Sequence, residues 1–433
     1  MIVFYELKDL CIDIIDCPHS TPKWLNEGIP VIRNYNISGG QLDLSKLSYV
    51  DEETYESRIK RAKPVENDII ISREAPMGEA CLVPGNFKCC LGQRLVLLKV
   101  DKEKCNPHYL LYALLSPYVQ TQIKRINQTG SIVSNLNIPD LKKLVIPYIK
   151  DNQNNIAQCL EVLNKKIFNN NKINKELESM AKTIYDYWFL QFEFPNEDGK
   201  PYKSSGGKMV WNEELKREIP EGWRVGRLNE FIMQDKGGDW GKATKEGKYT
   251  KKVTCLRGAD FPSICGNAKL EAPERFINEK NTFKILKRGD LIIEISGGSP
   301  TQSTGRICYI NTNVLKRFKN ELITSNFCKA VNLIDEDFMY WFYNLWNKLY
   351  YSGVFFKYEG KTTGIKNLLF EMLCRDYPII IPDVNLIKKY NHKIEKLFDV
   401  IQENLLENAE LSSLRDFLLP LLMNGQIGFK EYT

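Results

Sequence analysis

The chain of 433 residues contains few of the residues that metal sites require. It has only three histidines, His19, His108 and His392, and its twelve cysteines are scattered without a CxxC pair. Zinc sites draw on clustered Cys and His, and disulfide scaffolds require a dense cysteine framework. We therefore predict reduced, packed thiols and neither a metal centre nor disulfides.

Long apolar runs are also missing. No uninterrupted stretch approaches the roughly 20 apolar residues that a membrane helix needs, and no charged start precedes an apolar signal region. These absences predict a soluble, cytoplasmic protein without a membrane partner.

The motifs of an enzyme are present only as incomplete versions. Gly360–Thr363 reads GKTT, but six residues instead of four separate it from the preceding glycine, Gly353. Asn106–Tyr109 reads NPHY, in which His108 replaces a proline of the amino-methyltransferase motif, and no glycine-rich cofactor loop precedes it. A structural turn leading into a helix explains NPHY better. The Glu-x-Lys triplets at Glu246 and Glu359 lack the upstream Pro-Asp of a nuclease centre. We predict a chain without catalysis of its own.

Charge is mildly positive and unevenly placed. The net charge of +6 comes from residues 1–150, at +2, and from residues 220–385, at +6, while the segments after each are close to neutral. Two basic blocks are compatible with a nucleic-acid partner, although a solvated lysine-rich surface has the same composition.

The sequence repeats itself with an offset of about 220 to 235 residues. PVIRNYNI from Pro30 pairs with TCLRGADF from Thr254, and VENDIIISR from Val65 pairs with KRGDLIIEIS from Lys287; SIVSNL from Ser131 pairs with TGIKNL from Thr363, and LVIP from Leu144 pairs with IIIP from Ile379. Four matches in the same order indicate an internal duplication. We place the start of the second copy at Ile219, where IPEGWRVGRLNEFI resembles the opening of a domain.

Each copy begins with short β-branched runs between turn signals and ends in a long helix. The sequence therefore predicts an α+β fold of two tandem domains of mixed sheet and helices. The expected parts are domain 1 at 1–150, a central long helix at 151–192, a linker at 193–218, domain 2 at 219–385 and a C-terminal long helix at 386–425.

Both helices carry an apolar heptad stripe, and this spacing is typical of helices that pack along one seam. The stripe residues are Ile156, Leu160, Leu163, Ile167 and Leu177 in the first helix and Ile394, Leu397, Ile401, Leu411 and Leu414 in the second. We expect the helices to pair with each other as an antiparallel coiled coil, although helices of another protein could also cover the stripes. Asn170, Asn174, Asn404 and Asn408 interrupt the stripes, either as a solvated stretch or as residues that fix the register.

Polar loops with interleaved aromatic residues provide candidates for DNA contact. Lys236–Gly258 carries six lysines and Arg257 with Trp240 and Tyr249, and the segments 72–79, 128–135 and 356–367 hold similar donors. Such side chains suit phosphates and base edges, although solvated loops or ordinary turns explain them as well. The candidates are Arg33, Asn34, Tyr35, Arg73, Arg94, Gln128, Ser131, Lys242, Lys245, Lys248, Tyr249, Lys251, Arg257, Lys357, Lys361, Thr362 and Lys366.

Four segments resemble those of a known family. Gly199–Leu228 is similar to the segment that joins the halves of type I restriction-modification specificity subunits, and Leu414–Ile427 resembles the end of their second helix; GSIVSNL and TTGIKNL resemble the end of their recognition domains. The resemblance covers essentially the whole chain. It implies that each domain is a target recognition domain for one half of a split, asymmetric site in double-stranded DNA, and that the helices set the spacing.

The same resemblance implies partners and the place of the chemistry. Two modification subunits would bring S-adenosylmethionine and adenine methylation, and restriction subunits would bring ATP, Mg²⁺, translocation and cleavage, so that no cofactor is expected on this chain. One departure is that the first copy begins abruptly near Tyr5 without the Pro-Glu-Gly-Trp opening, which predicts a differently organised N-terminal edge. The alternatives are a fused methyltransferase-endonuclease, a coiled-coil scaffold and a decoy subunit without DNA targeting.

Overall fold

The computed structural model describes residues 2–128, 135–266, 270–297, 302–362 and 365–429. The chain divides into two compact units. Unit 1 comprises Met1–Ile167 with Glu410–Thr433, and unit 2 comprises Phe168–Ala409. Both long helices therefore contribute residues to each unit, and the two units are described separately.

Unit 1 contains a four-stranded antiparallel sheet and a smaller mixed sheet. The first has the order β2 (Cys11–Asp16), β10 (Leu95–Val100), β7 (Ile69–Ser72) and β8 (Ala80–Leu82). The second has the order β6 (Ser48–Val50), β3 (Ile29–Ile32) and β9 (Cys90–Leu91), in which β3 and β9 are parallel. All four residues of β7 are buried, and the first three are isoleucines.

Unit 2 repeats this topology strand for strand. Its antiparallel sheet has the order β15 (Ile232–Gly237), β22 (Cys328–Leu333), β18 (Leu291–Glu294) and β20 (Ile307–Tyr309). Its smaller sheet has the order β17 (Glu274–Asn278), β16 (Tyr249–Leu256) and β21 (Leu322–Thr324), and β16 and β21 are again parallel. The duplication inferred from the sequence is confirmed at the level of strand order.

Short helices follow the strands in both copies. Unit 1 has α1 (Glu52–Arg58), α2 (Pro107–Leu115), α3 (Pro117–Gln128) and α4 (Ile138–Lys142), and unit 2 has α6 (Phe261–Cys265), α7 (Thr312–Lys316), α8 (Met339–Tyr351) and α9 (Phe370–Asp376). The NPHY segment starts α2 because Asn106 Oδ1 accepts hydrogen bonds from the backbone N–H of His108, at 2.8 Å, and of Tyr109, at 3.2 Å. This is an N-cap, which confirms the structural interpretation of that segment.

The edge strands correct one expectation. In unit 1, β1 (Ile2–Glu6) pairs antiparallel with β11 (Val145–Ile149), and in unit 2, β14 (Arg224–Arg227) pairs antiparallel with β25 (Pro378–Ile381). A short 3-10 helix follows β1 and another follows β14. The prediction of a differently organised N-terminal edge is therefore wrong, because strand pairing needs backbone groups and not the Pro-Glu-Gly-Trp residues.

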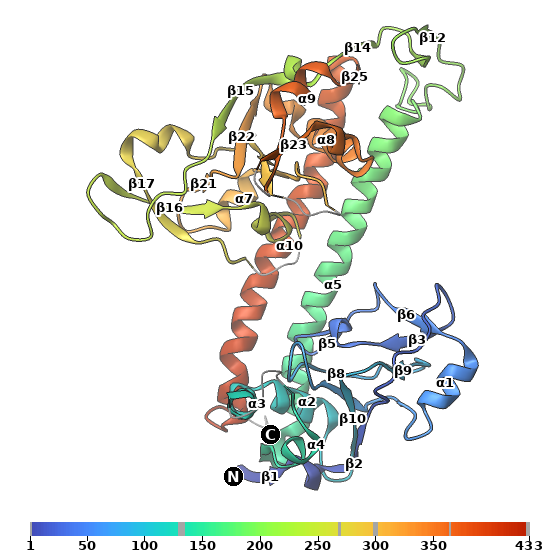
Figure 1. Ribbon diagram of the computed structural model, residues 1–433, viewed down its shortest axis with the longest axis vertical. Helices are drawn as coiled ribbons and strands as arrows, with labels where there is room; N and C mark the ends of the chain where they lie inside the picture. The colour runs from blue at the N-terminus through green and yellow to red at the C-terminus, as the bar shows by residue number, and fades with distance from the viewer. Residues whose placement is uncertain (1, 129–134, 267–269, 298–301, 363–364, 430–433) are drawn as a thin grey trace. The chain divides into compact units, whose positions relative to one another are not determined.

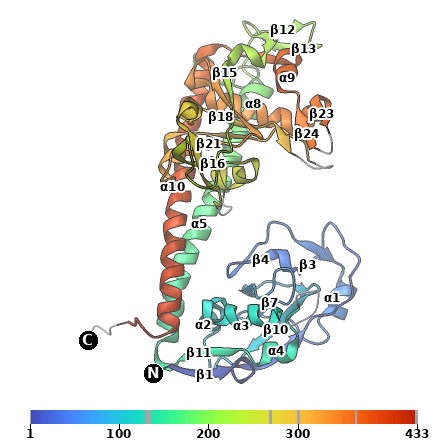
Figure 2. The same ribbon diagram turned by 60° about the vertical axis from the view of Figure 1, so that its left-hand side comes forward.

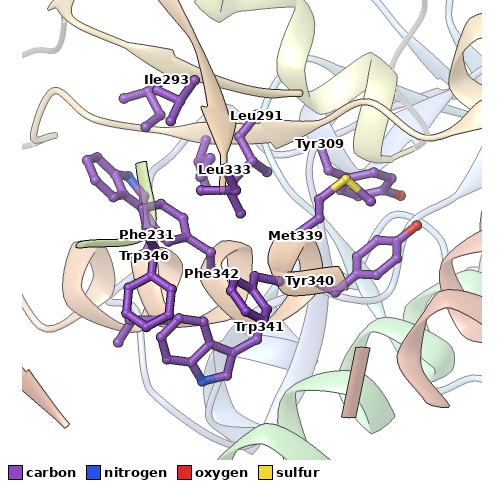
Figure 3. Close-up of a cluster of buried hydrophobic side chains, with 14 of the residues drawn as sticks. Phe231, Leu291, Ile293, Tyr309, Leu333, Met339, Tyr340, Trp341, Phe342 and Trp346 are labelled. Atoms are coloured by element: carbon purple, nitrogen blue, oxygen red, sulfur yellow. The ribbon is translucent and has the colours of Figure 1, made fainter. Parts of the chain in front are cut away.

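The core of unit 2 is built largely from aromatic side chains. Helix α8 contributes Trp341, Phe342 and Trp346, all nearly or fully buried. Figure 3 shows them close to Phe231, Leu291 and Leu333, which come from the segment before β15 and from strands of the sheet. The sheet and α8 therefore share one hydrophobic core that fixes the loops at the sheet's ends.

The two long helices extend close to the expected ranges. Helix α5 covers Gln153–Tyr185 and continues as a π-helical turn at Asp186–Leu190, and α10 covers Val384–Met423. Within unit 2 they run side by side (Figures 1 and 2). The pairing is antiparallel, since Asn170 contacts Asn408 while Asn174 contacts Asn404.

The linker expected at 193–218 contains a hairpin. Strand β12 (Met209–Asn212) pairs antiparallel with β13 (Arg217–Pro220). Ile219 therefore lies within the second strand of this hairpin, and the strand that corresponds to β1 begins at Arg224. Between them, Trp223 is buried against Phe189, Phe192 and Phe194.

The predicted seam is correct in part. Ile156, Leu160, Ile394 and Ile401 are buried, whereas Leu163, Ile167, Leu177, Leu397 and Leu411 are only partly buried. Leu414 is 45% exposed, so its assignment to the seam is wrong. Straight helices have 3.6 residues per turn, so a buried stripe drifts away from a strict heptad count, and Asn164 and Phe398 occupy the buried positions beside Leu163 and Leu397.

The asparagines of the seam form a buried ladder within unit 2. Asn170 Nδ2 donates to Asn408 Oδ1 at 2.9 Å and to Glu407 Oε2 at 2.7 Å, and Asn404 Nδ2 donates to Asn174 Oδ1 at 2.8 Å. Asn170 and Asn174 are 1% and 2% exposed, so the solvated-stretch interpretation is wrong. A shift of one helix along the other would leave these buried amides unpaired, which favours the single observed register.

We expect Asn174→Ala to lower the free energy of unfolding by about 1 to 2 kcal/mol, because it leaves the partly buried amide of Asn404 without its acceptor. Chemical denaturation monitored by circular dichroism would measure the loss. The control is Lys175→Ala on the same helix, whose side chain is exposed. An equal effect of both substitutions would contradict a role for the ladder.

Candidate nucleic-acid interface

Three loops of unit 1 meet at one edge of its sheets. Asn34 Nδ2 donates to the carbonyl of Ala75 at 2.6 Å, and the backbone N–H of Gly39 donates to Glu79 Oε2 at 2.7 Å. The backbone N–H of Leu136 donates to the carbonyl of Arg73 at 3.1 Å. Segments that lie far apart in the sequence therefore form one surface, and this surface contains most of the candidates of domain 1.

Arg73 fastens these loops together and is not presented to solvent. Its Nη1 donates to Asp16 Oδ1 at 2.8 Å, its Nη2 to Asn135 Oδ1 at 3.2 Å and its Nε to the carbonyl of Leu136 at 3.0 Å. The residue is 8% exposed. We therefore correct its assignment from a DNA contact to a structural clamp, since all three of its nitrogens are already engaged.

Arg33 and Arg257 occupy equivalent positions but differ in their partners. Each precedes a 3-10 turn in which its backbone N–H donates to a side chain three residues later, Asn36 in unit 1 and Asp260 in unit 2. Asp260 also binds the Arg257 guanidinium through Nε at 2.9 Å and Nη2 at 2.8 Å. The neutral amide of Asn36 does not bind the guanidinium of Arg33. Arg33 therefore extends over the exposed rings of Trp24 and Tyr35, while Arg257 is held within its own loop.

The other candidates of domain 1 differ in accessibility. Tyr35 is 49% exposed and its hydroxyl lies 3.0 Å from Ser48 Oγ, and Arg94 is exposed with its Nε 3.1 Å from Glu74 Oε2. Ser131 and the side chain of Gln128 lie outside the described residues. Tyr35 and Arg94 remain predicted DNA contacts.

Unit 2 gathers the corresponding loops in the same way. Ser296 Oγ donates to Asn367 Oδ1 at 2.5 Å, and the backbone N–H of Thr304 donates to Glu359 Oε1 at 2.8 Å. Arg306 and Glu294 form a two-point ion pair at 2.7 and 2.9 Å. A Cβ at Gly258 would lie 2.4 Å from Glu294 Oε1, so a larger residue there would displace the ion pair.

The lysine-rich loop of domain 2 is anchored by its backbone and exposes its charges. The backbone N–H and carbonyl of Lys242 both bond to Phe276, each at 2.9 Å. Lys242, Lys245 and Lys248 are exposed, and the Lys242 ammonium lies 5.8 Å from the ring of Tyr249. Lys242 Nζ also lies 3.5 Å from Glu246 Oε1, and Lys251 pairs with Glu321.

The candidates in the segment 356–367 also differ in exposure. Lys357 is exposed, whereas Lys366 is mostly buried and its Nζ lies 3.0 Å from Glu359 Oε2. Lys366 is therefore a structural cation, which corrects its assignment. Lys361 and Thr362 belong to β23 (Glu359–Thr362), but their side chains lie outside the described residues. The GKT portion of the Walker-like segment is thus part of a strand, which does not fit a phosphate-binding loop that opens a helix.

The cysteines are packed thiols. All twelve are free, and ten of them are buried. Burial raises the pKa of Cys89 to about 12 and that of Cys90 to about 11, so these thiols stay protonated near neutral pH. Among the described residues, no group of three or more His, Cys, Asp or Glu side chains could hold a metal ion.

Sequence reasoning missed three residues at this interface. These residues are Trp24, Arg275 and Asp16. Trp24 lies under the Arg33 guanidinium, Arg275 lies over the ring of Trp240, and Asp16 forms an ion pair with Arg73. The duplication itself contained one signal, because Trp24 and Trp240 both lie between the strands that correspond to β2 and β3. The pairing of Arg275 with Trp240 is a tertiary contact and left no signal in the sequence.

Within the described ranges, none of the helices combines the length and apolar character that crossing a bilayer requires.

Comparison with known proteins identifies similar chains. Residues 2–179 match the model of the family described as type I restriction modification DNA specificity domain. The type I restriction enzyme MjaIX specificity subunit of Methanocaldococcus jannaschii is 26% identical over 381 residues, covering 84% of this chain and 78% of that protein. The putative MjaX specificity subunit of the same organism is 25% identical over 413 residues, covering 93% and 88%.

A solved structure supports the fold. The crystal structure of the S subunit of a type I restriction-modification system from M. genitalium superimposes with a TM-score of 0.57 and covers 100% of this chain and 97% of that one. Its sequence identity is 18%, so this likeness concerns the architecture of tandem mixed domains with long helices.

Proposed function

Because the chain belongs to the family of type I restriction-modification specificity subunits, we propose that it reads a bipartite, asymmetric DNA site and directs adenine methylation and restriction by partner subunits. The partners would be two modification subunits and restriction subunits that act in the cytoplasm. We expect S-adenosylmethionine, ATP and Mg²⁺ to bind to those partners, and we assign no catalytic step to this chain.

One observation carries the proposal. Both copies have the same order of strands in both sheets, yet the side chains at the equivalent loops differ, as Arg33 with Asn36 differs from Arg257 with Asp260. A scaffold shared by the two copies but carrying different loops is suited to reading two different sequences. The exposed lysines of domain 2 supply the positive charge that phosphates require.

The test is to co-express the chain with a cognate modification subunit and to map methylated adenines in the host DNA by single-molecule sequencing. We expect a split motif with two unrelated halves, one of which changes when residues 1–150 are exchanged for those of a relative. The matched control exchanges residues 219–385 and should change the other half. Stable assembly without methylation would favour a decoy subunit, and the absence of a complex would favour a scaffold.

A further inference from the structure

Equivalent loops of the two copies each present one exposed tryptophan. Trp24 lies in the loop between β2 and β3, and Trp240 lies in the loop between β15 and β16. Their exposed fractions are 37% and 36%. The loops share almost no sequence, so the common placement of a large aromatic side chain is a property of the duplicated fold.

An arginine covers each of these rings. The Arg33 guanidinium carbon lies 4.8 Å from the ring centroid of Trp24 and 4.8 Å from that of Tyr35. The Arg275 guanidinium carbon lies 4.3 Å from the ring centroid of Trp240, and its Nε donates to the Trp240 carbonyl at 2.9 Å. Arg33 follows β3 and Arg275 lies in β17, so the same arrangement is made from different strands.

Neither arginine has a carboxylate partner within the described parts of the chain. This sets them apart from Arg73, Arg257 and Arg306, whose guanidinium groups bind Asp16, Asp260 and Glu294. Among the described residues, Arg33 Nη1 makes only long contacts of 3.5 Å, with the hydroxyl oxygens of Tyr35 and Ser48. The rings thus orient guanidinium groups that keep donors for another molecule.

Both loops are fixed to the body of their domain. The buried guanidinium of Arg58 donates to the carbonyls of Ser20, at 3.0 Å, and of Pro18, at 3.2 Å. In unit 2, the backbone N–H of Trp240 donates to Asn326 Oδ1 at 3.1 Å, and Gly241 has φ +60 with no room for a Cβ beside Phe276. A prearranged side chain loses less conformational entropy on binding.

Building on the proposed function, we propose that the pairs Trp24–Arg33 and Trp240–Arg275 are base-reading elements, one for each half of the DNA site. The planar guanidinium can donate two hydrogen bonds to O6 and N7 of a guanine in the major groove. The tryptophan holds this fork in position and contributes little to sequence choice itself. Tyr35 and Ser48 surround only the first pair, so the two elements have different surroundings.

The experiment uses the complex of the full chain with its modification subunit and compares wild type with Arg33→Ala and Arg275→Ala. Arg33→Ala should reduce discrimination at one G·C pair of one half-site by about 5- to 150-fold and leave the other half unchanged. Arg275→Ala should reduce discrimination in that other half-site and leave the first half-site unchanged. The motif and the fraction of each site methylated are read by single-molecule sequencing of host DNA.

The controls separate charge and folding from base reading. Lys104→Ala and Arg375→Ala remove exposed cations that pair with Asp101 and Asp376, and neither should change the motif. Arg33→Lys keeps the charge and a donor but not the planar fork, so it should lose less discrimination than Arg33→Ala and more than wild type. Trp24→Phe keeps a ring under the guanidinium and should stay closer to wild type than Trp24→Ala. Assembly with the modification subunit and the thermal midpoint verify folding.

Two outcomes would overturn the inference while the proposed function stands. One is a wild-type complex that methylates a split site with both alanine variants keeping both halves of the motif. The other is an Arg33→Ala complex whose methylation falls equally at matched and mismatched sites, which would indicate a phosphate contact instead of a base contact. Failure of the wild-type complex to methylate any split site would instead contradict the proposed function.

Discussion

Replacing Trp346 with alanine should lower the free energy of unfolding of unit 2 by about 3 to 5 kcal/mol, because it removes a fully buried aromatic side chain. The ring lies 4.8 Å from that of Phe355 and 5.9 Å from that of Phe370, and its Nε1 donates to the carbonyl of Gly305 at 2.6 Å. Differential scanning calorimetry would measure the loss.

Amide hydrogen exchange would show which strands of the Trp346→Ala variant are destabilised. Amides of β18 and β20 should exchange faster, since these strands pack on α8 in the same core. The control is Trp211→Ala in β12, which removes a tryptophan that is 58% exposed and should change stability by less than about 0.5 kcal/mol. Similar losses for the two variants would show that the aromatic core of Figure 3 does not dominate the stability of this unit.

Arg73→Ala should lower the free energy of unfolding by about 2 to 4 kcal/mol, because it leaves a buried carbonyl and two side-chain acceptors without their donor. The same substitution tests our correction, since a structural clamp and a DNA contact predict different results. Urea denaturation monitored by circular dichroism would measure the stability of the variant.

The matched control for Arg73 is Arg61→Ala. Arg61 is exposed and donates only a long hydrogen bond of 3.4 Å to the carbonyl of Asp16, so its loss should be nearly neutral. A stable Arg73→Ala protein whose methylation motif has changed would restore Arg73 to the DNA contacts. Loss of stability with an unchanged motif in the surviving complex would confirm the clamp.

Equivalent positions of the two copies, Arg33 and Arg257, have different roles. Asp260 carries a charge that keeps Arg257 within its own loop, and Asn36 lacks that charge. A single change between aspartate and asparagine therefore decides whether the preceding arginine is structural or presented outward. This kind of change alters the chemistry of a loop while the strand order beneath it stays the same.

The sequence by itself determined the duplication, the mixed domains and the two long helices, because strand and helix periods and repeated segments are local patterns. It also indicated where the polar positions of the seam lie, at Asn170 and Asn174.

The tertiary structure alone decided which cations are available. Arg73 is bound by Asp16 of a distant strand, Lys366 by Glu359 of the neighbouring strand and Arg257 by Asp260 of its own loop. By contrast, Lys245 is exposed, and Arg33 has no carboxylate partner among the described residues. The tertiary structure also brought Arg275 onto Trp240 and excluded Leu414 from the seam, since side-chain partners and helix drift depend on how separate segments pack in space.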